Sequence, residues 1–113
     1  MPLSGIWTVE IAGIYGWENR GILIFCDDKK HVMGGGRNHY SVGSYKKSGD
    51  KVKIKLDVYF HDQKQVVFGE KRKNIAVVLE GKLKDIKIRG YVNNPKNSKQ
   101  SVPLRLTRRA DLP

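Results

Sequence analysis

The 113-residue sequence has little cysteine: Cys26 is the only one, so no internal disulfide can form. A lone thiol fits a reducing compartment, and we expect a cytoplasmic protein. No stretch approaches the roughly 18 apolar residues that a membrane helix needs. The start, MPLSGIWTVE, lacks the basic region and long apolar run of a signal peptide. These absences predict one domain spanning residues 1–113, without a membrane span.

Patterns that carry catalysis or metal binding are also missing. The histidines His31, His39 and His61 lack the i, i+4 spacing of a helical zinc site, and Cys26 has no second thiol. His31 and His39 could approach each other across a glycine-rich stretch, but two ligands leave a metal site incomplete. No G-x-S-x-G elbow is present, and no base can be assigned to Cys26. We therefore predict a non-enzymatic protein with no catalytic residue, metal or cofactor.

Acidic residues are scarce in the second part of the chain. Residues 46–113 carry 18 basic and seven acidic residues, whereas residues 1–45 carry four of each. The whole formal charge of +11 therefore lies after residue 45. Such an asymmetry suggests an anionic partner, namely nucleic acid, a membrane surface or an acidic protein, although a solvated surface explains it equally well.

Helical periodicity is absent, and alternation with a period of two dominates instead. KVKIKLDVYF, residues 51–60, places apolar side chains on one face and mostly lysines on the other. Residues 7–11, 85–92 and 102–106 alternate in the same way, while residues 22–25, 66–68 and 75–79 are short apolar runs. Turn residues separate these segments. About eight strands without a long helix predict an all-β, eight-stranded antiparallel up-and-down barrel, because closure buries the apolar face and removes exposed edges.

Three consecutive glycines, Gly34 to Gly36, interrupt this pattern. They are followed by Arg37 and the strand-like segment HYSVGSY, so no helix N-terminus is available to hold a phosphate. Glycine tolerates positive φ and lets another strand approach closely. We predict a bend between two paired strands.

Individual side chains can be assigned to the two sides of the barrel wall. Trp7 is expected to plug one end, whereas Trp17 lies in a hairpin or loop and is a plausible exposed contact. The predicted interior, either filled or lining a ligand cavity, comprises Trp7, Leu23, Phe25, Tyr40, Phe60 and Leu79. The predicted basic outer surface comprises Lys51, Lys53, Lys55, Lys87 and Arg89.

Several short motifs resemble the GrlR-type regulators of bacterial type III secretion. They are Gly5-Ile6-Trp7, Gly21-Ile22-Leu23-Ile24, Gly34-Gly35 and Tyr40 to Gly43. The resemblance covers residues 4–60 well and the remainder by strand pattern and length. The G-x-W opening also resembles that of lipocalin- and avidin-like barrels. The resemblance implies a lipocalin-like barrel, a homodimer, and a negative regulator that acts without catalysis by sequestering a transcriptional activator.

The resemblance also implies an acidic partner-contact loop, and here the sequence departs from it. The matching loop is Lys46, Lys47, Ser48, Gly49 and Asp50, which is basic. A reversed charge selects against the original partner, so the identity of the bound protein is not carried over. With Trp17, this loop is the predicted protein-binding site.

Three functions stay open at this point. The first is a regulatory protein that binds an acidic protein or a transcriptional activator. The second is a carrier of a small apolar ligand inside the barrel. The third is nucleic-acid binding by the basic outer surface with its interleaved tyrosines.

Overall fold

The computed structural model describes residues 3–113, which form ten strands and one short 3-10 turn, η1 (Asp27–Lys29). The strands are β1 (Gly5–Gly13), β2 (Gly16–Cys26), β3 (His31–Gly35), β4 (His39–Ser48), β5 (Lys51–Phe60), β6 (Gln65–Val67), β7 (Glu70–Arg72), β8 (Asn74–Lys84), β9 (Lys87–Asn94) and β10 (Asn97–Ala110).

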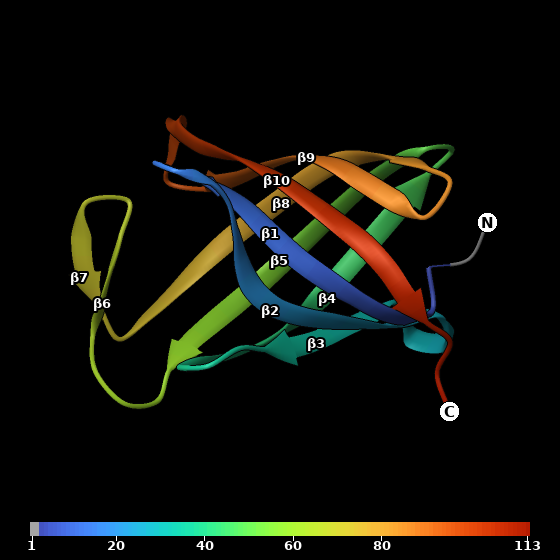
Figure 1. Cartoon of the computed structure of the whole chain (residues 1–113), viewed down its shortest axis with the longest axis horizontal. Helices are drawn as coiled ribbons and strands as arrows, with labels where there is room; N and C mark the ends of the chain where they lie inside the picture. The colour runs from blue at the N-terminus through green and yellow to red at the C-terminus, as the bar shows by residue number, and fades with distance from the viewer. Residues whose placement is uncertain (1–2) are drawn as a thin grey trace.

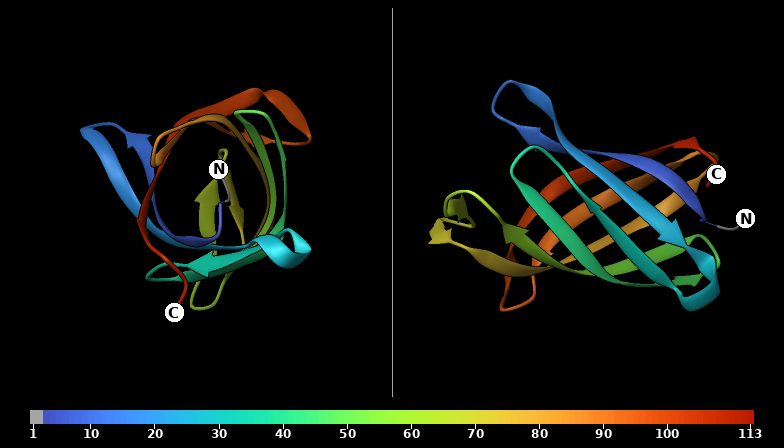
Figure 2. Two further views of the ribbon diagram at one scale, coloured as in Figure 1. Left: turned by 90° about the vertical axis from the view of Figure 1, so that its right-hand side faces the viewer. Right: turned by 90° about the horizontal axis from the view of Figure 1, so that it is seen from below.

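Eight of these strands close into one antiparallel barrel (Figures 1 and 2). Successive barrel strands pair along the chain, with β5 pairing to β8 past the β6–β7 segment, and β1 pairs with β10 to complete the ring. The predicted up-and-down barrel is thereby confirmed. Among residues 3–113 there is no helix of the length and apolarity needed to cross a membrane.

One predicted strand lies elsewhere. The apolar run 66–68 was expected in the barrel wall, but β6 pairs only with β7 and forms a separate hairpin beyond the end of β5. Phe68 and Gly69 both have positive φ, 49° and 81°. Positive φ at both central residues is the signature of a tight two-residue hairpin turn, which reverses the chain before a wall strand can form.

The glycine-rich stretch serves close packing as well as the predicted bend. Gly34 and Gly35 belong to β3, and Gly36 begins the turn into β4. A Cβ on Gly34 would lie 2.0 Å from the carbonyl oxygen of Ile22 in β2. Only glycine therefore allows β2 and β3 to approach as closely as they do.

One end of the barrel, which we call the plugged end, is filled by side chains. Trp7 and Phe25 are fully buried with ring centroids 5.7 Å apart, and Tyr45 meets Phe25 edge-on at 5.2 Å. The Trp7 indole N–H donates a hydrogen bond to the Leu3 carbonyl at 2.9 Å, and Leu3 is itself buried. This confirms that Trp7 plugs one end.

A half-buried carboxylate ties the N-terminal segment to this plug. Asp27 accepts hydrogen bonds from the Tyr45 hydroxyl and from the backbone N–H of Ser4, the latter at 3.0 Å. Burial acts to raise the pKa of Asp27, but these two donors outweigh it and hold the pKa below its usual value. Burial and the bond to Asp27 raise the pKa of Tyr45. The pair is therefore a carboxylate with a neutral phenol.

Candidate functional site

The opposite end of the barrel, the open end, holds a cavity of about 580 Å³. Its deep wall is apolar and comes from residues on six strands: Val9, Ile11, Leu23, Leu56, Val58, Ile75, Val77, Leu79, Val92, Val102 and Leu104. Small-molecule sites measure about 300–1,000 Å³ and are mostly apolar, so this cavity has the size and lining of a ligand pocket.

Alternation along the strands explains why the cavity is apolar. In β5, Val52, Ile54, Leu56 and Val58 share the inward face, and the intervening lysines face solvent. At the plugged end, large aromatic rings fill the interior of the barrel. Toward the open end, the inward-facing residues are mainly Val, Ile and Leu. Smaller side chains leave the space that the aromatic rings fill at the other end.

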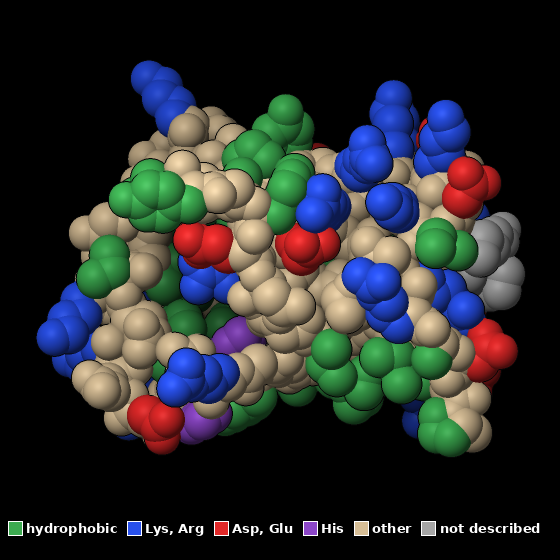
Figure 3. Space-filling model, viewed as in Figure 1, with side chains coloured by type: hydrophobic (Ala, Val, Ile, Leu, Met, Phe, Trp, Pro, Cys, Tyr) green, Lys and Arg blue, Asp and Glu red, His purple; other side chains and the backbone are tan. Residues whose placement is uncertain are grey.

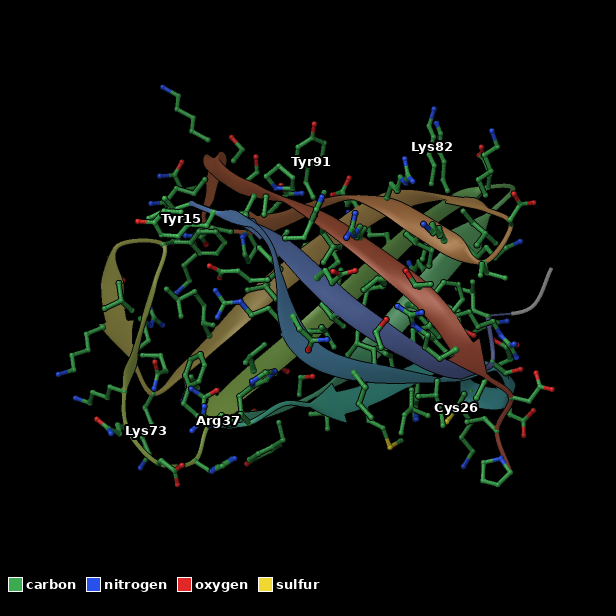
Figure 4. The ribbon with its side chains drawn as sticks, viewed as in Figure 1. Tyr15, Cys26, Arg37, Lys73, Lys82 and Tyr91 are labelled. Atoms are coloured by element: carbon green, nitrogen blue, oxygen red, sulfur yellow. The ribbon has the colours of Figure 1, made fainter. Side chains whose placement is uncertain are left out.

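The rim of the cavity is polar and cationic on one side. β2 contributes Asn19 and Arg20, and the segment leading into β4 contributes Arg37, Asn38 and His39. Figure 4 shows Arg37 at the end of the barrel where the β6–β7 hairpin also lies. Figure 3 shows the hollow from outside, with hydrophobic side chains in its depth and basic side chains and a histidine beside it.

The opposite side of the rim is the β6–β7 hairpin. Val67 and Phe68 pack against the barrel core, and Gln65 and Val66 complete this side of the cavity. The hairpin tip is tethered, because the Gln100 side-chain amide donates to the Phe68 carbonyl at 3.1 Å. A second hollow of about 530 Å³, more polar, lies between the hairpin and the β9–β10 turn.

A short chain of hydrogen bonds continues the tether into the barrel. The Gln100 side-chain oxygen accepts a hydrogen bond from the Asn94 amide at 2.8 Å. Asn94 ends β9 and Gln100 lies near the start of β10, so the hairpin is linked to the neighbouring turn. The hairpin is therefore held at the rim by the packing of Val67 and Phe68 and by this tether.

The predicted interior residues lie in three different places. Leu23, Phe60 and Leu79 line the cavity, whereas Trp7 and Phe25 belong to the plugged end. Tyr40 was expected inside, and this is wrong: it faces solvent, 49% exposed, and stacks on Tyr59 at 5.1 Å. The interior is therefore filled at one end and hollow at the other.

The orientation of Tyr40 follows from the register of β4. Tyr45 is anchored inside by Phe25 and Asp27, and side chains alternate with a period of two. Ser41 therefore faces inward and is buried, while Tyr40 and Val42 face outward. In this part of β4 the small or polar side chains therefore face the core and the large apolar ones face solvent.

The predicted protein-binding residues do not form one site. Lys46, Lys47 and Ser48 end β4, and Gly49 and Asp50 make an exposed turn into β5. Trp17 lies in β2, 43% exposed, with the Arg105 guanidinium 4.4 Å from its ring centroid. β10 and β2 flank β1, so this contact bridges the outside of the wall.

The predicted basic surface does lie on the outside of the barrel, on strands β5 and β9 with β8 between them. Like charges directly oppose one another across strands: Lys46 faces Lys53, and Lys82 faces both Lys51 and Arg89. Figure 4 shows Lys82 and Tyr91 projecting from the same side. Opposed like charges cost stability, and on this face Glu80 offsets the charge of Lys53, which it opposes across β5 and β8.

His31 and His39 do not approach each other. His31 begins β3 opposite Ser44, whereas His39 begins β4 opposite Phe60, so the two lie at opposite ends of the wall. No group of three His, Cys, Asp or Glu residues among residues 3–113 has a metal-binding arrangement. Cys26 is half-buried at the end of β2, at the plugged end.

Sequence reasoning missed the rim and the hairpin. Arg20, Arg37 and Gln100 carry no motif, and they become neighbours of the cavity through barrel closure. The one signal in the sequence was Arg37 directly after the glycine bend, which places a cation at an end of the barrel.

No protein-family model matches the chain, and no curated protein matches it either.

Proposed function

We propose that the protein is a non-enzymatic binding protein that holds a small apolar molecule inside its barrel. The observation that carries this proposal is the cavity of about 580 Å³ with its deep apolar wall. Of the functions left open by the sequence, the small-ligand carrier is the one that uses this feature. It needs no catalytic residue.

The asymmetry of the barrel supports the proposal. A barrel whose interior had only to be stable would be filled throughout, since protein interiors are close-packed and unfilled space costs stability. Here the plugged end is packed by Trp7, Phe25 and Tyr45, but the open end is not filled. Each CH₂ group that a ligand buried there would contribute about 0.8 kcal/mol to binding.

A cavity-filling variant tests this function. Val77 lies in the apolar wall, and Val77→Phe should occupy the space that a ligand needs. The matched control is Val42→Phe on the outside of the wall. We expect native mass spectrometry and titration with dodecanol to show binding to the wild type and to Val42→Phe, and at least about tenfold weaker binding to Val77→Phe, equivalent to ~1.4 kcal/mol. Binding to Val77→Phe as tight as to the wild type would contradict the proposal.

A second candidate function is protein binding by the outer apolar face, defined as Ile22, Met33, Tyr40 and Val42. Each of these side chains is 39–49% exposed. Met33 lies opposite Val42, and Gly35 lies between Ile22 and Tyr40, so the four form one patch across β2, β3 and β4. Contiguous exposed apolar side chains mark association sites.

We propose a second copy of the chain as the occupant of this face, in keeping with the dimeric regulators that residues 4–60 resemble. Light scattering should then show a dimer, and Val42→Lys should make it a monomer without lowering thermal stability. A monomer at all concentrations would remove this candidate and leave the ligand-binding function in place.

A further inference from the structure

The charge at the cavity is of one sign. Two arginines, Arg20 and Arg37, line it together with His39, and no Asp or Glu is among its lining residues. Both arginines lie on the rim and not on the deep apolar wall. A ligand that enters the cavity on this side therefore passes positively charged side chains before it reaches the apolar wall.

Neither arginine is fully neutralised by a neighbour. Arg20 pairs with Glu18 at 2.8 Å, but both side chains are about half exposed, 53% and 48%. Exposed pairs of this kind contribute little and exchange readily. Residues 3–113 form five ion pairs, and Arg37 takes part in none of them. A guanidinium beside an apolar, low-dielectric wall attracts anions more strongly than one on an open surface.

His39 adds a neutral hydrogen-bonding group to the same side of the rim. Burial lowers the pKa of His39, and the nearby Arg20 guanidinium and His61 side chain lower it further. Its ring packs edge-on against Phe60 with centroids 6.3 Å apart, and its Nδ1 lies 3.4 Å from the Asn38 side-chain oxygen. A neutral imidazole can donate to an anion without adding a third positive charge that the arginines would repel.

We propose that the ligand is a single-chain amphiphile with an anionic head group. Its alkyl chain occupies the apolar cavity, and its head group binds at the rim to Arg37 and Arg20, with His39 beside them. This proposal rests on the proposed ligand-binding function and adds the chemical class of the ligand. A guanidinium binds carboxylate and phosphate alike through paired N–H donors, so the head group is defined by its negative charge.

Ligands that share one alkyl chain and differ in the head group provide the test. Isothermal titration calorimetry would compare dodecanoate, dodecyl phosphate and neutral dodecanol on the full chain, the two anions below their micelle concentrations and dodecanol below its solubility limit. We expect the better anion to bind at least about tenfold more tightly than dodecanol, as charge-assisted hydrogen bonds provide. The stronger of the two anions identifies the head group as carboxylate or phosphate.

Variants then assign the effect to the rim. Arg37→Gln should weaken binding of the preferred anion about tenfold and leave dodecanol binding unchanged. The matched control is Arg89→Gln, which removes the same charge from the outside of β9 and should change neither. Thermal unfolding of each variant establishes that it is folded.

The outcomes separate the two proposals. Equal affinity for dodecanol and both anions, unaffected by Arg37→Gln, would overturn the head-group inference and leave the carrier function intact. Binding of the anions that Arg89→Gln weakens as much as Arg37→Gln would also overturn it, since the attraction would then be a property of net charge. No binding of any of the three ligands would contradict the carrier function itself.

Discussion

Removing the hydrogen bond between the Tyr45 hydroxyl and the Asp27 carboxylate tests how the plugged end is held together. Tyr45→Phe keeps the ring against Phe25 and removes only the hydroxyl, so Asp27 loses one of its two donors. A hydrogen bond to a charged group contributes about 1.5–3 kcal/mol, and the half-buried position of Asp27 places this one near the lower bound, ~1.5 kcal/mol. In a domain of this size that corresponds to a fall in Tm of about 6 °C.

The pH dependence gives this prediction a second, independent signature. The donors to Asp27 outweigh burial and lower its pKa below the ordinary value of about 3.9. A carboxyl group with a depressed pKa in the folded state stabilises the protein above about pH 4, and this stabilisation is lost as the pH falls through the folded value. The difference between wild type and Tyr45→Phe should be complete at neutral pH and shrink in acid.

Urea unfolding followed by circular dichroism at pH 7, 5 and 3 would measure this difference. Tyr91→Phe is the control, because Tyr91 is 54% exposed and its hydroxyl faces solvent, so its loss should change the free energy of unfolding by less than about 0.5 kcal/mol. A Tyr45→Phe effect no larger than that of the control at pH 7 would refute the reasoning. So would an effect that is the same at pH 3 as at pH 7.

Three further predictions follow from the wall, the hairpin and the outer surface. Gly43→Ala should destabilise the protein by about 3 kcal/mol in urea unfolding, because its Cβ would lie 1.8 Å from the Lys55 carbonyl oxygen; Gly49→Asn, in open space at a positive φ of 61° that asparagine tolerates, should cost under about 1 kcal/mol. Gln100→Ala removes the tether to Phe68 and should speed amide hydrogen exchange of residues 65–72 without changing that of β5, whereas unchanged exchange would show that packing alone holds the hairpin. Sodium chloride should raise Tm by screening the opposed cation pairs Lys46–Lys53, Lys51–Lys82 and Lys82–Arg89, at a few tenths of a kcal/mol for each pair, and a fall in Tm would count against that repulsion.

The barrel could be predicted from the sequence because its main determinant is local. Alternation in residues 51–60 places the apolar side chains on one face, and the structure buries Val52, Ile54 and Leu56 there. The position of Trp7 could be predicted for the same reason. A large aromatic side chain that faces inward near the start of a strand has little room anywhere but at the end of the barrel. Such features depend on a few neighbouring residues.

The features that the sequence did not reveal depend on tertiary pairing. Tyr40 and Val42 alternate with Ser41 and Gly43 as if they faced the core, but the anchoring of Tyr45 sets the opposite phase. Residues 66–68 have the composition of a wall strand, but the turn at Phe68 and Gly69 makes them a hairpin. Arg20 and Arg37 line the same cavity because β2 and β4 flank β3, which brings Arg20 of β2 and the turn before β4 to the open end. Neither the composition of the chain nor its period-two alternation specifies which distant residues become neighbours.

The position of the chain ends has a practical consequence. Both ends of the described chain emerge beside the plug, and the hairpin lies at the far end of the long axis (Figure 1). A surface-coupled or fused version attached through either end would therefore present its mouth to the bulk solution, where entry of a ligand is unobstructed. The same orientation suits the barrel for conversion into a sensor, with a fluorophore on a cysteine introduced at the exposed position 66 (Val66→Cys) reporting occupancy far from the point of attachment.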